Sequence, residues 1–93
     1  MSNDLSSTQV LQVSSDTIAD WLHNYVAELI GVNPEKVSRT QPLRKYGLDS
    51  ASAVTLTGDL AEWLKVDVDP SVLYEYPTIE RAAQHLASVV QGG

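Results

Sequence analysis

One segment of the chain, Tyr46-Gly47-Leu48-Asp49-Ser50, places a serine where a modification of its hydroxyl would be stabilised. Ser50 stands at the junction between a long loop and a predicted helix, and a helix start offers unpaired N–H groups and the positive end of the helix dipole. A phosphodiester formed on that oxygen would therefore meet a favourable potential. The same position also suits a plain helix cap made by Asp49 or Ser50. The pentapeptide alone leaves both interpretations open.

The other reactive residue types form no catalytic or metal-binding pattern. The histidines His23 and His85 lack the spacing of a zinc motif such as H-E-x-x-H, and no serine lies in a G-x-S-x-G elbow. The absence of cysteine excludes a disulfide framework, a thiolate zinc site and a cysteine nucleophile. One group of acids lacks the ligand order of an EF-hand and is expected to be a solvated surface: Asp67, Asp69, Glu75 and Glu80. We therefore expect no catalytic residue and no metal site.

Length and charge narrow the function further. The chain has 93 residues, enough for one small domain, and 12 acids against 6 bases give it a net charge of −6. Such a surface disfavours nucleic acid and anionic membranes as partners. No stretch approaches the ~20 apolar residues of a membrane span, and the first fifteen residues lack the basic and apolar regions of a signal peptide. We expect a cytoplasmic monomer.

Apolar stripes with helical period predict three long helices. They cover about 16–30, 50–64 and 78–90. Their apolar sides are expected to hold, in turn, Ile18, Leu22, Tyr25, Val26, Leu29 and Ile30; Ala53, Leu56, Leu60, Ala61, Trp63 and Leu64; and Ile79, Ala82, Ala83, Leu86, Ala87 and Val90. Gly58 inside the second helix costs ~1 kcal/mol relative to alanine, and a closely crossing neighbour helix would explain it.

A cap followed by proline at Asp69-Pro70 predicts a fourth, short helix over 70–75. Since no convincing strand is visible, we predict an all-α fold, a four-helix bundle of three main helices and one short helix with a long first loop. The domain is expected to span residues 16–90. Residues 1–15 and 91–93 are expected to be tails.

The loop of residues 31–49 is long for a compact domain, which suggests a function. Pro42 and Gly47 interrupt any longer helix in it, and one short turn is predicted at 34–37. Four apolar residues are expected to pin the loop to the core: Val32, Val37, Leu43 and Leu48. Four of the six bases also lie here: Lys36, Arg39, Arg44 and Lys45.

The tetrapeptide at 47–50, Gly-Leu-Asp-Ser, resembles the phosphopantetheine attachment motif of acyl carrier proteins. The resemblance extends over about residues 16–90 and includes the order helix, long loop, helix, short helix, helix. Tyr76-Pro77-Thr78 is similar to the "(F/Y)-P-T" boundary of modular carrier domains. Several landmarks in the right order are more specific than the tetrapeptide.

The resemblance implies that Ser50 accepts 4′-phosphopantetheine from coenzyme A, transferred by a separate, magnesium-dependent phosphopantetheinyl transferase. The arm ends in a thiol that holds an acyl group as a thioester, so the reactive sulfur arrives with the cofactor in a chain without cysteine. Asp49 matches the family's acidic residue before the serine. Leu48 and Val54 match positions near the arm and the partner surface. The chain would then be a carrier and not an enzyme.

The subclass follows from departures around the serine. Peptidyl carriers commonly show Gly-Gly-His/Asp-Ser, whereas Leu48 stands here at the second position, which favours an acyl carrier of polyketide or fatty-acid type. Ala51, Thr55 and Thr57 depart from the dissociated fatty-acid carriers and resemble modular polyketide synthase carriers. The stretches 48–53 and 73–78 are similar to those of carriers loaded by fatty acyl-AMP ligases.

The implied partners are the transferase, an acyl-loading enzyme (an acyl-AMP ligase or an acyltransferase), and a ketosynthase or other acyl-processing enzyme. The expected docking surface combines Val54 and Thr55 of the second helix with Arg44 and Lys45 of the loop. Mixed charge is expected to guide partner choice there. The alternatives are a peptidyl carrier domain and a helical interaction module that needs no cofactor.

Overall fold

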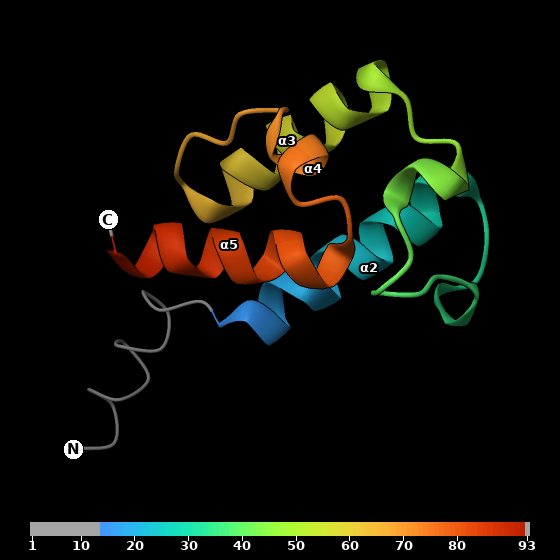
Figure 1. Ribbon diagram of the computed structural model, residues 1–93, viewed down its shortest axis with the longest axis horizontal. Coiled ribbons are helices and arrows are strands. Elements are labelled where there is room, and N and C mark those ends of the chain that lie inside the picture. Colours follow the sequence, from blue (N-terminus) through green and yellow to red (C-terminus); the bar gives the residue numbers. More distant parts are fainter. Residues whose placement is uncertain (1–13, 93) are drawn as a thin grey trace.

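In the computed structural model of this chain, residues 14–92 are described, with side chains for residues 14–90. The described residues form only helices. Their bounds are α2 (Ser15–Ile30), the 3-10 helices η1 (Pro34–Lys36) and η2 (Leu43–Tyr46), α3 (Ser50–Leu64), α4 (Val72–Glu75) and α5 (Ile79–Gly92). The all-α prediction is confirmed, with three long helices and one short one (Figure 1). The predicted tail of residues 1–15 lies outside the described residues except for its last two.

The helices begin and end at residues whose caps explain the bounds. The Ser14 hydroxyl accepts a hydrogen bond from the Thr17 N–H, so α2 begins at Ser15, and Gly31 ends it in the left-handed conformation at φ 77°. The Asp69 carboxylate accepts from the Ser71 N–H at 2.9 Å. This turn delays α4, which is shorter than the predicted helix over 70–75. α5 continues two residues beyond its predicted end.

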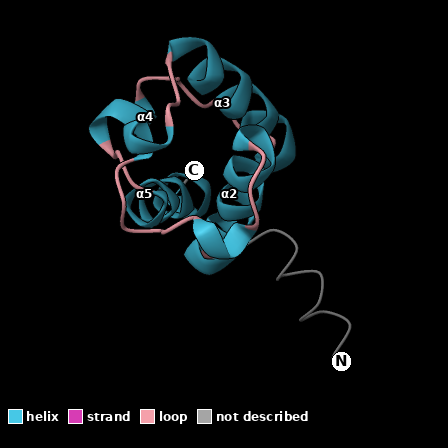
Figure 2. Cartoon of the chain, turned by 90° about the vertical axis from the view of Figure 1, so that its right-hand side faces the viewer, coloured by secondary structure: helices cyan, strands magenta, loops and turns pink. Residues whose placement is uncertain are grey.

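One apolar core lies between the helices, which surround it in the order α2, α3, α4, α5 when viewed along the long axis (Figure 2). Its completely buried side chains are Ile18, Leu22, Val26, Leu56, Leu60, Ile79 and Ala82. All were predicted to face the core. Full burial of each large aliphatic side chain contributes roughly 1.5–3 kcal/mol, so this cluster contributes substantially to the driving force for folding.

Three apolar residues predicted in the core are instead exposed. Leu29 is 40% exposed because the buried face of α2 ends at Ala27. Val32 follows the helix end and is also 40% exposed, whereas Val37 and Leu43 of the same loop are buried as predicted.

Trp63 is 38% exposed because it lies roughly 80° around α3 from the centre of the buried face. Thr57 is buried on that face, where its hydroxyl donates to the Ala53 carbonyl oxygen at 2.7 Å. A local bond of this kind removes most of the cost of burying a hydroxyl.

An aromatic stack connects α2 to α3 outside the core. The Trp21 ring lies 4.9 Å from that of Tyr25 and 5.3 Å from that of Trp63, with nearly parallel planes in both pairs. The Tyr25 hydroxyl donates to the Asp59 carboxylate at 2.6 Å. Burial, followed by this hydrogen bond and the charge of Asp59, raises the pKa of Tyr25 to about 12. Trp63 therefore serves as a link between helices.

No helix in the described part of the chain combines the length and apolar character that membrane crossing requires.

Gly58 has no packing explanation, contrary to the expectation of a closely crossing helix. A Cβ atom built there would meet nothing within 4 Å, and the residue is exposed. We therefore predict that Gly58→Ala raises the free energy of unfolding by about 0.5–1 kcal/mol, because alanine loses less backbone entropy on folding. Urea unfolding measures this. Gly31→Ala is the matched control: it is equally uncrowded but sits at φ 77°, so it should destabilise. A destabilising Gly58→Ala would contradict the model of an open site.

The Tyr25–Asp59 bond predicts a stability change at alkaline pH. The folded pKa of Tyr25, about 12, lies above its ordinary value of 10.0, so folding favours the protonated phenol. The advantage of wild type over Tyr25→Phe should be complete below pH 10 and should disappear as the pH rises towards 12. Urea unfolding of both proteins across this range tests it, with exposed Tyr74→Phe as control. An advantage that is constant through pH 12 refutes it.

Candidate functional site

The approach to Ser50 is shaped by η2 and the glycine that ends it. The Gly47 N–H donates to the Arg44 carbonyl oxygen at 3.0 Å, and its φ of 82° turns the chain out of η2. Only glycine adopts this conformation without strain. Leu48 then packs partly against the core, and Asp49 is extended, so Ser50 becomes the first residue of α3.

Asp49, and not Ser50, caps α3. Its carboxylate accepts the Ser52 N–H at 2.9 Å, and this backbone bond, followed by the interaction with the Ser52 side chain, lowers the pKa of Asp49. The carboxylate therefore stays ionised at neutral pH and sits at the positive end of the helix dipole. This resolves which of the two residues is the cap.

The Ser50 hydroxyl is free for chemistry. Ser50 is exposed, and among the described residues its side chain makes no hydrogen bond. The Ser50 N–H also precedes the first hydrogen bonds of the helix, whereas the N–H groups of Ala51 and Ser52 interact with the Asp49 carboxylate. An anionic group on the Ser50 oxygen would therefore lie at the positive end of the helix dipole. The position accommodates a phosphodiester without loss of the cap.

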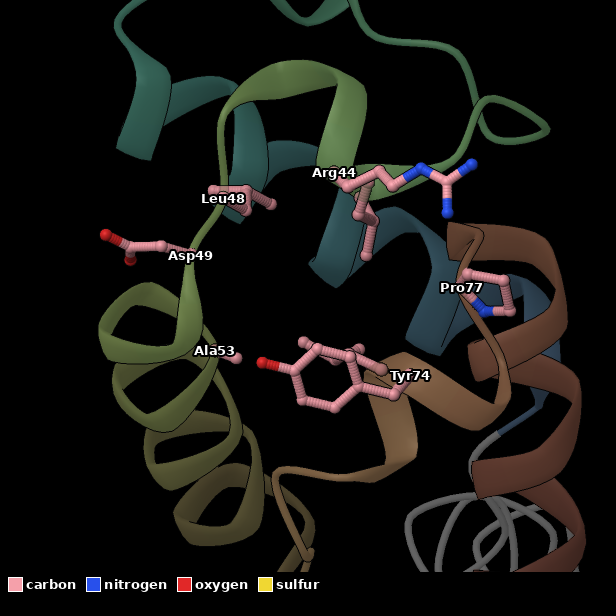
Figure 3. A pocket seen from close by; sticks show the side chains of 8 residues that line it. Arg44, Leu48, Asp49, Ala53, Tyr74 and Pro77 are labelled. Carbon is pink, nitrogen blue, oxygen red and sulfur yellow. The ribbon is translucent and has the colours of Figure 1, made fainter.

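A cleft of about 330 Å³ opens beside this helix start (Figure 3). Its lining is mostly apolar and comes from the loop, α3, α4 and the turn before α5: Leu43, Arg44, Leu48, Asp49, Ala53, Leu73, Tyr74 and Pro77. In Figure 3 the Tyr74 phenol reaches towards Ala53 on α3, while the Asp49 carboxylate points away from the cleft. The cleft is therefore an apolar surface next to Ser50, with its polar groups at the rim.

Three of these eight lining residues are not predictable as part of a site from the sequence. Leu73, Tyr74 and Pro77 follow Ser50 by more than twenty residues, and only the fold brings α4 opposite the start of α3. Tyr74 is 66% exposed, the most exposed large apolar residue among those described. A tyrosine in a short helix between two turns is a weak signal, because Tyr76 in the same stretch is partly buried against the core.

The predicted docking residues lie on two neighbouring elements. Val54 is 56% exposed and stands one helical turn after Ser50, on the same side of α3. Thr55 is exposed, and its hydroxyl donates to the Ala51 carbonyl oxygen at 3.1 Å. Arg44 and Lys45 are exposed on η2, and Arg44 also lines the cleft. The arrangement is a small apolar and basic surface around Ser50.

Two further charged residues, Arg39 of the loop and Asp59 of α3, are engaged away from Ser50. Arg39 forms an ion pair with Asp20 on α2, and Asp59 accepts the hydrogen bond from Tyr25. Within residues 14–92, no group of three or more histidine and acidic side chains is close enough to hold a metal ion.

The sequence matches the family described as "Phosphopantetheine attachment site" over residues 20–86, most of the chain. It is 36% identical over 69 residues to Polyketide synthase PksL of Bacillus subtilis, which covers 74% of this chain and 2% of that protein. It is 25% identical over 76 residues to Acyl carrier protein TtuC of Teredinibacter turnerae, which covers 82% of this chain and 87% of that protein. The chain thus spans only a few per cent of the polyketide synthases it matches.

A solved structure shares both fold and sequence. It is a free-standing peptidyl carrier protein from Acinetobacter baumannii, 33% identical, with a TM-score of 0.80 and coverage of 84% of this chain and 98% of that one. The helix order and the exposed Ser50 at the start of α3 thus agree with the family match over residues 20–86 and with the similarity to this solved structure. The chain belongs to the family of phosphopantetheine-binding carrier domains, which are not themselves enzymes, and it is related to the carrier domains of polyketide synthases.

Proposed function

We propose that Ser50 carries the phosphopantetheine arm and that the domain presents acyl groups to the enzymes of a polyketide-type pathway. One observation carries the assignment of the residue: Asp49 takes the capping role, which leaves the exposed Ser50 hydroxyl unbonded at the helix start. When bound, the group supplies a thiol that holds acyl chains as thioesters. The protein's own task is to orient and present it.

The residues around Ser50 have separate roles in this proposal. The N–H groups at the start of α3 stabilise the phosphodiester charge, and the Asp49 cap keeps that first turn helical. The apolar wall made by Leu48, Ala53 and Leu73 offers a surface on which the arm or the first carbons of its cargo can lie out of water. Tethering raises the effective concentration of the cargo at each partner's active site.

The acyl assignment rests on the residue before Asp49 and on the relatives. Leu48 replaces the second glycine common in peptidyl carriers. The polyketide synthases matched come from bacteria and fungi, at 28–38% identity. On this proposal the arm is loaded by an acyl-AMP ligase or an acyltransferase and is unloaded by a ketosynthase or a similar enzyme.

A peptidyl carrier is the second candidate, because the structure from Acinetobacter baumannii bears that description at 33% identity. The two differ in the loading enzyme. The protein that bears the phosphopantetheine arm is offered both kinds of cargo. If it accepts fatty acyl groups from an acyl-AMP ligase and no amino acids from an adenylating enzyme, the acyl carrier is favoured. The reverse result favours the peptidyl carrier.

The attachment residue is tested by intact mass after incubation with coenzyme A, magnesium and a broad-specificity phosphopantetheinyl transferase. Wild type should gain the mass of one phosphopantetheine, and Ser50→Ala should gain none while keeping its helical circular dichroism. Ser52→Ala is the matched control, since Ser52 lies in the same first turn, and it should be loaded like wild type. Modification of Ser50→Ala would show that the attachment site is another residue. An unmodified wild type would indicate a cofactor-free interaction module.

The docking surface is tested by charge reversal on η2. If Arg44 and Lys45 attract an acidic partner, then the double variant Arg44→Glu, Lys45→Glu should raise the KM for transferase loading or acyl loading by roughly 5-fold or more, the factor that corresponds to ~1 kcal/mol. The kcat should change little, and the KM of the double variant should depend less on salt concentration than the KM of wild type does. The double variant Lys36→Glu, Arg81→Glu, at exposed positions on η1 and α5, serves as the control with the same change of net charge. Equal effects of both variants would reduce the role of η2 to overall charge.

The apolar part of the same surface can be tested in parallel with Val54→Asp and Thr55→Asp. These exposed positions should affect partner KM without lowering stability.

A further inference from the structure

One histidine holds two separate points of the loop that leads to Ser50. The His23 side chain projects from α2, and its Nε2 lies 2.5 Å from the Pro34 carbonyl oxygen in η1. Its Nδ1 lies 3.2 Å from Nε of Arg39, five residues further along the loop. Both ring nitrogens are therefore used, each by a different part of the loop.

These partners permit a single protonation state of the ring. A carbonyl oxygen only accepts, so Nε2 must carry a proton, and the Arg39 Nε–H only donates, so Nδ1 must be bare. His23 is thus neutral in this arrangement. A proton added to Nδ1 would set two N–H donors and two positive charges against each other, and the bond to Arg39 would be lost.

We call the two hydrogen bonds of His23, to Pro34 and to Arg39, the clamp. The charged groups around the clamp reduce the repulsion between a protonated His23 and Arg39, but they do not remove the clash between two N–H donors. On α2, Asp20 accepts a hydrogen bond from the Arg39 guanidinium. On α5, Glu80 lines a shallow surface pocket together with Arg39 and Asp16. The adjoining η1 carries Glu35 and Lys36, both exposed. These acids attract the guanidinium and a protonated ring alike, yet none of them can turn a donor into an acceptor.

The clamp is connected to the segment that presents Ser50. The backbone oxygen of Arg39 accepts the Glu80 N–H at 3.0 Å, which ties this point to α5. The neighbouring Ser38 N–H donates to the Tyr46 hydroxyl at 2.7 Å. Tyr46 is the last residue of η2, directly before Gly47 and the helix start. Hydrogen bonds and the chain therefore link His23 to the loop end through Arg39, Ser38 and Tyr46.

We propose that neutral His23 is a positioning residue for the loop of residues 31–49, and that protonation of its Nδ1 releases Arg39 and loosens the segment from Ser38 to Tyr46. Histidine side chains ordinarily change charge between pH 5 and 8, and this is therefore the range in which the clamp is tested: the neutral ring closes it and the protonated ring opens it. The clamp itself follows from contacts within the protein. Its importance for loading rests on the function proposed for Ser50.

The first test uses the unmodified protein and nuclear magnetic resonance, and it needs no cofactor. At the upper end of the range the ¹⁵N spectrum of the imidazoles should show His23 as the Nε2–H tautomer. The amide signals of Ser38 and Tyr46 should shift with the same midpoint as the His23 ring. His23→Gln, whose amide can both donate and accept but does not titrate, should abolish these shifts. His85→Gln, at the other histidine, should retain them. Loop amides that ignore the His23 titration, or that still titrate in His23→Gln, would overturn the proposal.

The second test measures transferase loading. His23→Phe, which removes both hydrogen bonds, should lower kcat/KM by about 3- to 10-fold at the upper end of the pH range, the loss expected for about one net hydrogen bond. His23→Gln should recover most of the kcat/KM that His23→Phe loses. The fall of kcat/KM at low pH should be seen in wild type and in His85→Gln, and it should be weaker in His23→Gln. Full activity in His23→Phe would also overturn the proposal. Failure of the Ser50 mass test would refute the carrier site and leave the magnetic resonance result to decide the clamp.

Discussion

The placement of Ser50 depends on how the loop between α2 and α3 is tied to the rest of the fold. The Leu43 side chain is buried, and its N–H donates to the Pro77 carbonyl oxygen at 2.8 Å. This bond holds η2 against the turn that leads into α5. Because Gly47 and Asp49 follow η2 directly, the same contact determines where α3 begins and forms one side of the cleft. A loop on the surface is thereby given the fixed geometry that a modification site requires.

The start of α3 assigns two tasks to two residues. The Asp49 carboxylate accepts the Ser52 N–H, while the Ser50 oxygen, which makes no hydrogen bond among the described residues, lies at the positive end of the helix dipole. If the serine capped its own helix, a modification of its oxygen would compete with that hydrogen bond. The observed division lets the oxygen change its chemistry without change in the helix. It also explains how a site can sit at a helix end in a domain with so small a core.

The core and the cleft share three buried residues, Leu43, Ala53 and Leu73, which form part of the apolar wall of the cleft. Among the described residues the buried side chains are apolar except for Thr57, which bonds to its own helix. Polar chemistry is confined to the rim of the cleft and to the hydrogen bonds that hold the loop. Under the proposed function Ser50 has to be exposed, and it lies on a surface that also carries the exposed side chains of Val54, Arg44 and Tyr74. The exposed residues at the rim of the cleft can thus vary without change to the core, whereas the residues of its wall also contribute to stability.

The sequence by itself determined the helices, most of the core and the position of Ser50 at the start of a helix. Ile18, Leu22, Leu56, Leu60 and Ile79 repeat with helical period, and periodicity is a local property that a single chain displays directly. Gly47 and Asp49 likewise act on their immediate neighbours, so the start of α3 was readable from adjacent residues. Chemistry that depends on spacing along one helix or turn can be predicted in this way.

Only the tertiary structure decided which distant residues meet. Three contacts join separate elements: Tyr74 faces Ala53 across the cleft, Trp21 stacks on Trp63, and the two ring nitrogens of His23 form hydrogen bonds with Pro34 and Arg39. Where the predicted apolar stripes failed, at Leu29 and Trp63, the reason is also tertiary: a helical pattern marks an apolar side but not how far its neighbours extend to cover it. The same applies to Val32, which was expected to pin the loop to the core and is exposed.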